Sequence, residues 1–449
     1  MLSKNQLHDV TIEDYNSDGF GVARILGQVV FVAQALLGET CRIRILKTAK
    51  THAFAKVEEV ISPSPERQAP PCKAFGPCGG CDLLHMSYAE ELRLKEMRVQ
   101  SAVSRIAGIN CPVSPVLPAE NRFHYRNKAM FAISEKGLGF YRKRSHNVVP
   151  IDACLIQSSI ANRALTVIHS WMHHFQVPAY TEANHSGILR HLFVRTAQKD
   201  SHATVCLVVK EDNFAGQEAL IQDLQTHCPE ISGISLCINA DITNVVLRGT
   251  FRTLWGQDFL EERLCGLEFQ LSPKSFFQIN PTQAEVLYET ALSFAALTGE
   301  ETVLDLYCGT GTITQILAKQ AKLAIGCEIV ASAVSDAKEN AKRNHISNTE
   351  FILGDVSKLM KTLQERKLSI DVVVLDPPRK GLDASVITEI AEISPKRVVY
   401  VSCDPGTLAR DLDRFQKIGY QTTQIQPVDM FPCTTHVECV VLMTRVEML

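Results

Sequence analysis

The stretch VLDLYCGTGT, residues 303–312, decides the fold of the C-terminal part of this 449-residue chain. Its first half is an apolar run typical of a buried strand, and Gly309 and Gly311 then lead into a segment with helical spacing. Glycines at such a turn allow a ligand to lie close against the backbone at the N-terminus of a helix. The stretch lacks the full G-x-G-x-x-G fingerprint, so taken alone it is weak evidence for a nucleotide site.

Strands and helices alternate on both sides of this stretch. Before it, NPTQAEVLYETALSFAAL (280–297) predicts a helix with Asn280 as N-cap and Pro281 at the first helical position. Apolar strands are predicted at TVLDLY, LAIGCE, FILGD, DVVVLD, RVVYVS and ECVVLMTR, and helical patterns such as ASAVSDAKENAKRN fall between several of them. This alternation predicts an α/β fold with a parallel, doubly wound sheet.

Acidic residues end three successive predicted strands of that sheet: Glu328, Asp355 and Asp376. Open α/β sheets bind ligands in the crevice at the carboxyl ends of their strands, and a carboxylate such as Glu328 can bind two ribose hydroxyls. Each acid alone is equally well explained as a helix cap. Together they favour an adenosine ligand without pyrophosphate, which is S-adenosylmethionine, and no Walker lysine motif indicates ATP.

The N-terminal 265 residues divide into two further parts, as expected for a chain too long for one core. Residues 1–61 contain five short strand patterns separated by glycines, which predicts a small β-barrel of the oligonucleotide-binding type. The proline-rich segment SPSPERQAPP (62–71) reads as a linker, and residues 62–265 mix strands and helices. One helix is predicted to start at a capping box of Ser87 and Glu90 and to end at Gly108.

Local charge indicates a nucleic-acid partner although the net charge is −3. Residues 42–56 carry five Lys or Arg and no acid, and residues 122–144 carry seven against Glu135 alone, with aromatic residues interleaved. Basic groups neutralise phosphates and aromatic rings stack on unpaired bases. A solvated charged surface explains either patch taken alone, but two patches in one half of the chain favour RNA or DNA.

The cysteines suggest metal binding rather than disulfides. The N-terminus has no signal-peptide pattern and no apolar run is long enough for a membrane helix, so we expect a cytoplasmic protein with no membrane partner. Three thiols lie close together at Cys72, Cys78 and Cys81. Structural zinc usually takes two paired knuckles, so this spacing favours an iron–sulfur cluster with one distant ligand, either Cys154 or Cys111.

A further cysteine stands at the end of a strand. In RVVYVSCDPGTLARD (397–411) the apolar run stops at Ser402, and Cys403 follows immediately. Such a thiol lies at the mouth of a sheet. From the stretch itself it could be a packing residue, a metal ligand or a nucleophile.

Taken together, these motifs resemble the bacterial RNA 5-methyluridine methyltransferases, most closely the 23S ribosomal RNA branch. The resemblance covers nearly the whole chain and rests on the cysteine set and on SFFQIN, LDLYCGTG, LDPPRKGL, SCDP and THVE. It implies an RNA-binding TRAM β-barrel over 1–61, a central iron–sulfur and RNA-binding domain over 62–265, and a Rossmann-like methyltransferase domain over 266–449. The helix after Cys81 is expected to pack on that last domain.

The resemblance also implies roles for individual residues. The ligands of a [4Fe–4S] cluster become Cys72, Cys78, Cys81 and Cys154. The S-adenosylmethionine site becomes Gln278, Tyr307, Thr312, Glu328, Asp355 and Asp376. Cys403 becomes the nucleophile and Glu438 the base. One departure is visible in FPCTTHVE, where Cys433 stands at a position at which relatives often carry His or Gln.

These residue types suit methylation of uracil at C5. A thiolate that adds to C6 turns the ring into an enolate, so that C5 attacks the methyl group; a base then removes the C5 proton and the thiolate is expelled. The thiol of a free cysteine is mostly protonated at neutral pH, so its surroundings must favour the thiolate. The target uridine must also be unpaired and flipped into the site. We expect a monomer that acts on RNA, with 23S ribosomal RNA as the expected substrate.

Other functions remain open at this point. DPPR (376–379) is similar to the D-P-P-Y loop of enzymes that methylate exocyclic amines of adenine or cytosine, and such enzymes need no cysteine nucleophile. Transfer RNA is an alternative substrate for uracil methylation. An iron–sulfur protein that binds RNA without methylating it is a third possibility, which the acids at the strand ends argue against.

Overall fold

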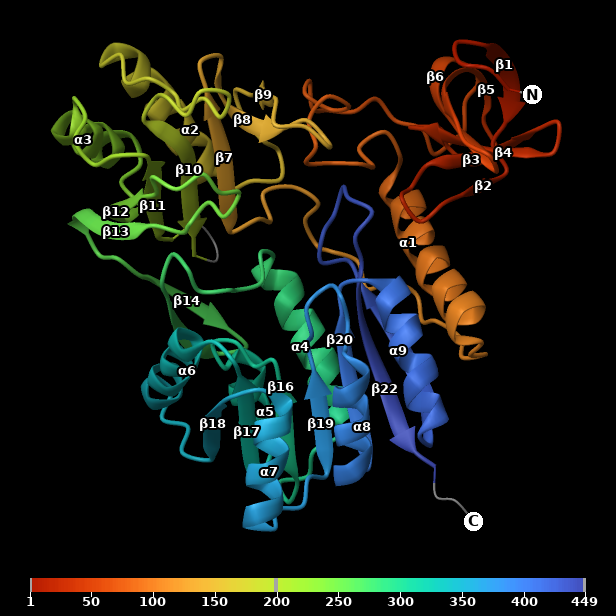
Figure 1. Ribbon diagram of the computed structural model, residues 1–449, viewed down its shortest axis with the longest axis vertical. Coiled ribbons are helices and arrows are strands. Elements are labelled where there is room, and N and C mark those ends of the chain that lie inside the picture. The colour runs from red at the N-terminus through yellow and green to blue at the C-terminus, as the bar shows by residue number, and fades with distance from the viewer. Residues whose placement is uncertain (1, 198–200, 447–449) are drawn as a thin grey trace.

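The computed structural model describes residues 2–197 and 201–446. Within these residues the larger sheets are one of six strands and two of seven. The N-terminal and central sheets lie at one end of the molecule and the C-terminal sheet at the other (Figure 1). None of the helices in the described part of the chain has the length and apolar character needed to span a membrane.

The N-terminal sheet has the strand order β1-β5-β6-β4-β3-β2. Its strands are β1 (Leu7–Thr11), β2 (Asp14–Tyr15), β3 (Gly21–Ile25), β4 (Gln28–Ala33), β5 (Thr40–Thr48) and β6 (His52–Ser62). Neighbours pair antiparallel except β4 and β6, which are parallel. Alternate residues such as Val30, Ile43 and Ala53 are buried and form one small core. The five strand patterns predicted here correspond to six strands, because the first pattern contains both β1 and the two-residue β2.

The central sheet has the order β13-β12-β11-β10-β7-β8-β9. Its strands are β7 (Lys128–Ser134), β8 (Gly137–Tyr141), β9 (Val148–Pro150), β10 (Leu189–Thr196), β11 (Ala203–Val209), β12 (Ile231–Ile238) and β13 (Thr250–Gly256). Helices α2 (Ser159–His174) and α3 (Gln217–His227) share one core with this sheet, in which Trp171 is almost fully buried. A hairpin of β14 (Leu260–Leu264) and β15 (Leu267–Leu271) leads to the C-terminal part.

The C-terminal sheet has the order β18-β17-β16-β19-β20-β22-β21. Its strands are β16 (Thr302–Leu306), β17 (Leu323–Glu328), β18 (Thr349–Leu353), β19 (Val372–Leu375), β20 (Arg397–Ser402), β21 (Tyr420–Val428) and β22 (Glu438–Arg445). The first five in this order are parallel, but β22 is antiparallel to both β20 and β21. The prediction of an all-parallel sheet is therefore wrong at this edge. The strand β21 escaped prediction because its sequence YQTTQIQPV is largely polar.

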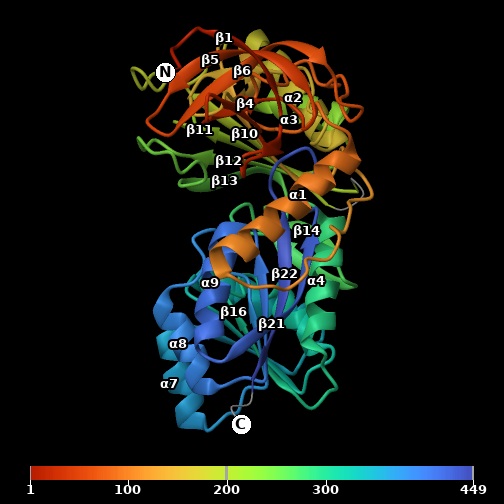
Figure 2. The same ribbon diagram turned by 90° about the vertical axis from the view of Figure 1, so that its right-hand side faces the viewer.

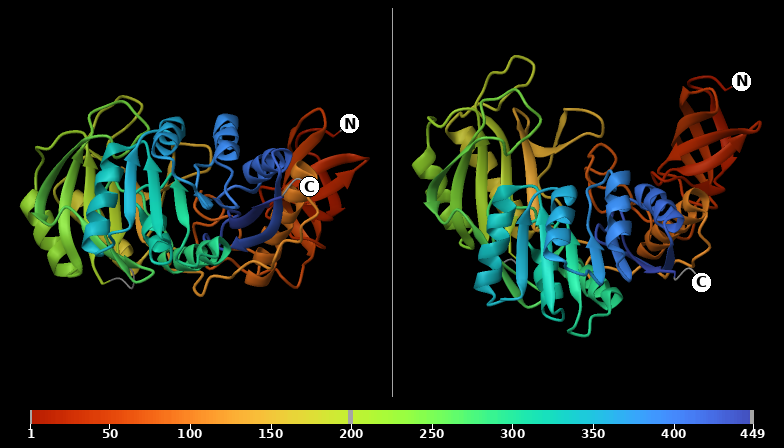
Figure 3. Two further views of the ribbon diagram at one scale, coloured as in Figure 1. Left: turned by 90° about the horizontal axis from the view of Figure 1, so that it is seen from below. Right: turned by 60° about the horizontal axis from the view of Figure 1, so that its bottom comes forward.

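Helices cover both faces of the C-terminal sheet (Figure 3). They are α4 (Pro281–Ala295), α5 (Thr312–Ala318), α6 (Ala331–Arg343), α7 (Val356–Arg366), α8 (Ala384–Ile393) and α9 (Pro405–Lys417). Residues of α4 and α5 share a core with one side of the strands, whereas residues of α7, α8 and α9 share a core with the other. As predicted, α4 has Asn280 as its N-cap and a proline in its first turn.

Helix α1 (Tyr88–Ala102) and the π-helical turn η1 (Val103–Ala107) run along the C-terminal sheet, as expected for the helix after Cys81 (Figure 2). Val99 and Val103 belong to the same core as α9. The hydroxyl of Ser87 caps the helix by accepting from the Glu90 N–H at 3.2 Å. The reciprocal half of the predicted capping box is wrong, because the Glu90 carboxylate accepts from Arg93 and from the Tyr15 hydroxyl instead.

Candidate active site

The direction of β22 determines what gathers at the carboxyl edge of the sheet. Cys403 follows the end of β20, and Asp376 follows the end of β19 beside it. Because β22 is antiparallel to β20, it begins at this same edge, and Ser402 pairs with Cys439. Glu438, the first residue of β22, therefore lies next to Cys403. Three predicted site residues that are far apart in the sequence are brought together.

Burial raises the pKa values of these three groups, and like charges add to the effect on Glu438 and Cys403. Glu438 is only 3% exposed, and its burial together with the neighbouring Asp376 raises its pKa to about 8. Burial raises the pKa of Asp376 to about 7. The half-buried thiol of Cys403 has a pKa raised to about 11, first by burial and then by Glu438. Carboxyl groups with pKa values near neutrality can exchange protons with a substrate, which is the property a general base needs.

The loop after β16 is shaped by two glycines with different roles. Gly311 is the N-cap of α5 with φ 76°, and a Cβ there would lie 2.7 Å from the ring of Phe351, so helix packing requires glycine. Gly309 has φ 53° and no atom within 4 Å of where its Cβ would be. The backbone at Gly309 thus faces open space, as a ligand-binding loop requires. Tyr307 precedes it with φ 68°, and Thr312 is buried in the first turn of α5.

Glu328 at the end of β17 is held by backbone donors. Its Oε1 accepts from the N–H groups of Ile329 at 2.7 Å and Val330 at 2.9 Å, and its Oε2 accepts from Gly309 at 3.2 Å. These three bonds fix the carboxylate beside the glycine loop. Because a carboxylate oxygen has two lone pairs, Oε2 can accept a further bond from a ligand. Asp355 is exposed and follows the end of the neighbouring strand β18. The predicted ligand-binding acids therefore line the ends of β17, β18 and β19 in that sheet.

Gln278 connects the central sheet to this edge. Its side chain is 7% exposed and hydrogen bonds to the hydroxyl of Tyr288, and that hydroxyl is close enough to Asp376 and Glu438 for their charges to raise its pKa. The carbonyl of Gln278 accepts from the Asn127 side chain at 3.0 Å. Tyr288 was not predicted as a site residue, because at its place in an apolar helix the sequence pattern only indicates packing.

Asp305 is a second group that the sequence reasoning missed. It is fully buried in β16, where burial raises its pKa to about 7. The Thr314 hydroxyl donates to its Oδ2 at 2.6 Å, whereas its Oδ1 has no partner within the described residues. The signal was visible in VLDLYCGTGT, since a carboxylate in the middle of an apolar strand needs a reason.

The predicted cluster ligands line one cavity. Cys72, Cys78 and Cys81 approach it from the loop before α1, and Cys154 from the loop before α2, with Phe75 and Phe140 among the apolar walls. Burial raises the pKa of the Cys78, Cys81 and Cys154 thiols, and neighbouring thiols add to the effect. The rival ligand Cys111 is buried in the core of the C-terminal sheet instead. The cavity thus brings together the four cysteines that the resemblance implied as ligands.

The metal prediction is not supported by a ready-made ion site in the described part of the chain. Across residues 2–197 and 201–446, no set of three or more His, Cys, Asp or Glu side chains is arranged to hold a metal ion. Cys433 packs beside the cavity with Cys81, and its carbonyl accepts from the N–H groups of Asp82 and Leu83.

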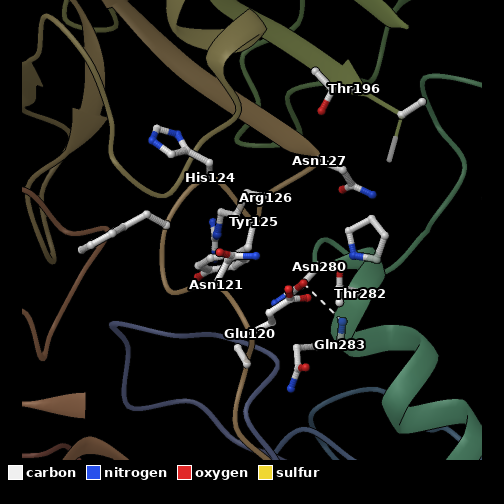
Figure 4. Close-up of a pocket in the computed structure, with 14 residues that line it drawn as sticks. Glu120, Asn121, His124, Tyr125, Arg126, Asn127, Thr196, Asn280, Thr282 and Gln283 are labelled. Carbon is white, nitrogen blue, oxygen red and sulfur yellow. Dashed lines mark hydrogen bonds between the residues drawn. The ribbon is translucent and has the colours of Figure 1, made fainter. Parts of the chain in front are cut away.

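A larger pocket of about 250 Å³ lies between the central sheet and α4 (Figure 4). It is lined by residues 119–121 and 123–127, by Thr196 and Ala197, and by Asn280 with the first three residues of α4. Most of its amide groups are already used: Asn280 Oδ1 accepts from the Gln283 N–H, and its Nδ2 donates to Met430. The pocket adjoins Asn127, which bonds to Gln278.

Comparison with known proteins gives consistent matches. A family model described as tRNA (Uracil-5-)-methyltransferase matches residues 87–446, and a TRAM domain model matches residues 4–57. Relatives called uncharacterized RNA methyltransferases include one from Clostridium tetani, 42% identical over 99% of this chain and 97% of its own, and one from Halalkalibacterium halodurans, 40% identical over 98% of each. The crystal structure of Pyrococcus abyssi tRNA (uracil-54, C5)-methyltransferase with S-adenosyl-L-homocysteine is similar with a TM-score of 0.79 and 27% identity, over 97% of this chain and 99% of that one.

Proposed function

The chain belongs to the tRNA (uracil-5-)-methyltransferase family with an N-terminal TRAM domain, and from that premise we propose that it methylates uracil C5 in RNA through Cys403 and Glu438. It is an S-adenosylmethionine-dependent RNA methyltransferase. The observation that carries the proposal is the antiparallel β22, which starts with buried Glu438 next to Cys403. An enzyme that methylates exocyclic amines has no use for a thiol and a proton acceptor at one point.

In the proposed reaction Cys403 and Glu438 act in sequence. The Cys403 thiolate adds to C6 of a flipped uracil, and the electron pair displaced from the C5–C6 double bond makes C5 nucleophilic. C5 then takes the methyl group that bound S-adenosylmethionine supplies. The Glu438 carboxylate removes the C5 proton, and the returning electron pair re-forms the double bond as the C6–S bond breaks. Because its pKa is about 8, Glu438 is a stronger base once ionised than an ordinary carboxylate.

The donor site is proposed at the strand ends and the glycine loop. Glu328, fixed by three backbone donors, suits the ribose hydroxyls, and the open backbone at Gly309 allows close approach. The full proposed set is Gln278, Tyr307, Thr312, Glu328, Asp355 and Asp376. Asp376 belongs to both sites, so donor and target base would meet at the end of β19.

We propose 23S ribosomal RNA as the substrate class, on the motif resemblance and the TRAM domain. Transfer RNA is the second candidate, because the similar crystal structure is that of a tRNA (uracil-54, C5)-methyltransferase. Mass mapping of both RNA classes from cells with and without the protein separates the two. Loss of a methyluridine from transfer RNA alone would overturn the ribosomal assignment.

The four-thiol cavity is proposed to hold a [4Fe–4S] cluster with a structural role. Cys72, Cys78, Cys81 and Cys154 would hold it, and their iron–thiolate bonds would tie the loop before α1 to the loop before α2. Nothing in the proposed reaction needs electron transfer. Protein purified anaerobically should contain iron and sulfide and absorb broadly in the blue, and Cys78→Ser should lose both. Stoichiometric zinc without iron would contradict the proposal.

Trapping a covalent adduct tests the mechanism. Glu438→Gln keeps the thiol but not the base, so a methylated enzyme–RNA adduct should accumulate and survive denaturing electrophoresis. Cys403→Ala should form no adduct, even with 5-fluorouridine RNA, whose fluorine cannot be removed as a proton. As a control, Cys265→Ser replaces a half-buried thiol in the β14–β15 turn and should behave as wild type. If no Cys403-linked peptide is found in either trap, the amine-methylating alternative is preferred.

A further inference from the structure

The surroundings of Cys403 oppose the form of its thiol that the reaction needs. The reaction needs a thiolate at Cys403, yet burial and the neighbouring Glu438 and Asp376 all favour the thiol. A nearby cation would favour the thiolate and would offset the negative charge that develops on the substrate. The question is which cation is close enough and is not already neutralised by another acid.

Most cations around this edge are committed elsewhere. Lys95 is fully buried between Glu91 and Asp429. Arg98 donates to the Thr435 carbonyl and lies 3.9 Å from Asp404. Each of these charges is already opposed by a carboxylate and is held by other groups.

Arg379 differs from them. It lies in the loop after β19, three residues beyond Asp376, and its side chain is exposed. Within residues 2–197 and 201–446 its guanidinium forms no ion pair with a carboxylate. Its charge favours the ionised forms of both Cys403 and Glu438. Arg379 is therefore an uncommitted cation close to both reacting groups.

Hydrogen bonds tie Arg379 to the two loops that carry those groups. Its carbonyl accepts from the Thr407 hydroxyl at 3.2 Å, and the Thr407 N–H donates to Asp404 Oδ1 at 2.9 Å, one residue after Cys403. On the other side its Nη2 lies 3.1 Å from Nδ1 of His436, two residues before Glu438. Arg379 is thus tied to the Cys403 loop through its backbone carbonyl and to the Glu438 loop through its guanidinium.

His436 is suited to hold a guanidinium. Burial, with Arg379 and Arg98 nearby, lowers the pKa of His436 to about 4, although Asp82 opposes the shift. The ring is therefore neutral near pH 7 and one of its nitrogens can accept a hydrogen bond from Arg379. Its edge-to-face contact with Phe431, at 6.0 Å between ring centres, further restricts its orientation.

We infer that Arg379, held in place by neutral His436, is the positioning residue that lowers the cost of forming the reactive thiolate of Cys403. This inference rests on the proposed function of Cys403. It gives His436 a defined role, as the acceptor that orients the guanidinium rather than as an acid or base. The charged groups facing the thiol are then Arg379 against Glu438 and Asp376, with Arg98 paired to Asp404 behind them.

The test measures the thiol directly, without RNA or donor. The alkylation rate of Cys403 by iodoacetamide is followed between pH 7 and 9.5 by mass spectrometry of the Cys403 peptide, in wild type, Arg379→Met, Arg379→Lys and His436→Ala. Losing one nearby charge shifts a pKa by about one unit or more, a tenfold loss of thiolate. The remaining thiolate is more nucleophilic, so the net rate should fall by about three- to fourfold in Arg379→Met.

The other variants define the interpretation. Arg379→Lys should recover most of the rate, and His436→Ala should give an intermediate value. Arg397→Met removes a cation from the first residue of β20, the strand whose other end precedes Cys403. Its Cys403 should be alkylated at the wild-type rate. Equal rates in Arg379→Met and wild type, or an equal fall in Arg397→Met, would overturn the inference. If no uracil is methylated but Arg379→Met still slows alkylation, only the proposed function fails.

Discussion

Two groups of buried charges lie at opposite ends of the segment 429–438, and they are built in opposite ways. In the first, the Lys95 cluster, Lys95 Nζ is fully buried and donates to Glu91 at 2.7 Å, to Asp429 at 2.6 Å and to the Phe431 carbonyl at 3.2 Å. Arg122 binds the other oxygen of Glu91 at 3.0 Å, and the Tyr88 hydroxyl binds Asp429 at 2.7 Å. Every carboxylate in this cluster has a charged partner.

In the second group, the Cys403 site, the exposed cation Arg379 acts on both Cys403 and Glu438, and Asp376 lies beside them. Burial raises the pKa of all three groups. Burial raises the pKa of Glu91 in the Lys95 cluster too, but there the cations Lys95 and Arg122 both oppose the shift. A fully paired buried cluster is costly to break and so serves structure, whereas an underpaired one can change protonation state during a reaction and so serves chemistry. The Lys95 cluster also holds the segment that leads to Glu438, because the Cys433 N–H donates to Glu91 at 2.7 Å.

The largest effect is expected from the replacement of Lys95. Lys95→Met leaves two buried carboxylates facing each other without their cation, so we expect the free energy of unfolding to fall by about 3–5 kcal/mol. Urea unfolding followed by circular dichroism measures this. The matched control is Lys417→Met, which removes an exposed pair with Asp413 and should cost less than about 1 kcal/mol. Equal effects of the two substitutions would mean that the buried cluster is not structural.

Glu328 differs from both groups, because backbone N–H groups rather than cations hold its carboxylate. Glu328→Ala should weaken binding of S-adenosylhomocysteine by roughly ten- to a hundredfold, because a hydrogen bond to a charged group contributes about 1.5–3 kcal/mol. Isothermal titration measures the affinity. Glu350→Ala on the neighbouring strand β18 removes an acid that pairs with Arg366 at the surface and should leave binding unchanged. Unchanged affinity in Glu328→Ala would remove this residue from the donor site.

The Cys403 site should reveal itself in the pH dependence of stability. The pKa of Glu438 is raised from 4.5 to about 8 in the folded protein. The stability that its protonated carboxyl group contributes is therefore fully present below pH 4.5 and is lost as the pH rises through 8. One such proton corresponds to a slope of at most about 1.4 kcal/mol per pH unit. Glu438→Gln cannot ionise, so its unfolding free energy should fall less between pH 5 and 8. Parallel curves for the two proteins would show that Glu438 titrates normally.

The smallest effect is expected at the surface. Arg366 and Glu350 form an ion pair at 2.6 Å with both side chains more than a third exposed. Arg366→Ala should leave the free energy of unfolding nearly unchanged, and added salt should remove any remaining difference. Thermal unfolding at low and high salt checks it. A loss approaching that of Lys95→Met would mean that burial does not separate the strong pairs from the weak ones.

Much of the fold could be read from local sequence patterns. Asn280 and Pro281 predicted the start of α4, and the glycines after β16 predicted the loop that opens α5. Acids at the ends of parallel strands must face one edge, so the grouping of Glu328, Asp355 and Asp376 followed from the strand pattern alone. The polar strand β21 could not be predicted in this way, because its sequence has neither the alternation nor the apolar run that marks a strand.

Most of the elements, the family and the residue types at the site can therefore be recognised in the sequence, because they depend on residues close together in the chain. Two features become visible only in the tertiary structure. The strand β22 runs antiparallel to β20, so that Glu438 lies beside Cys403. Cys154 rather than Cys111 lines the thiol cavity. The tertiary structure also decided that His436 faces Arg379. The physical reason is that hydrophobic periodicity records which face of an element is buried, but not the direction or partner of the strand against which it packs.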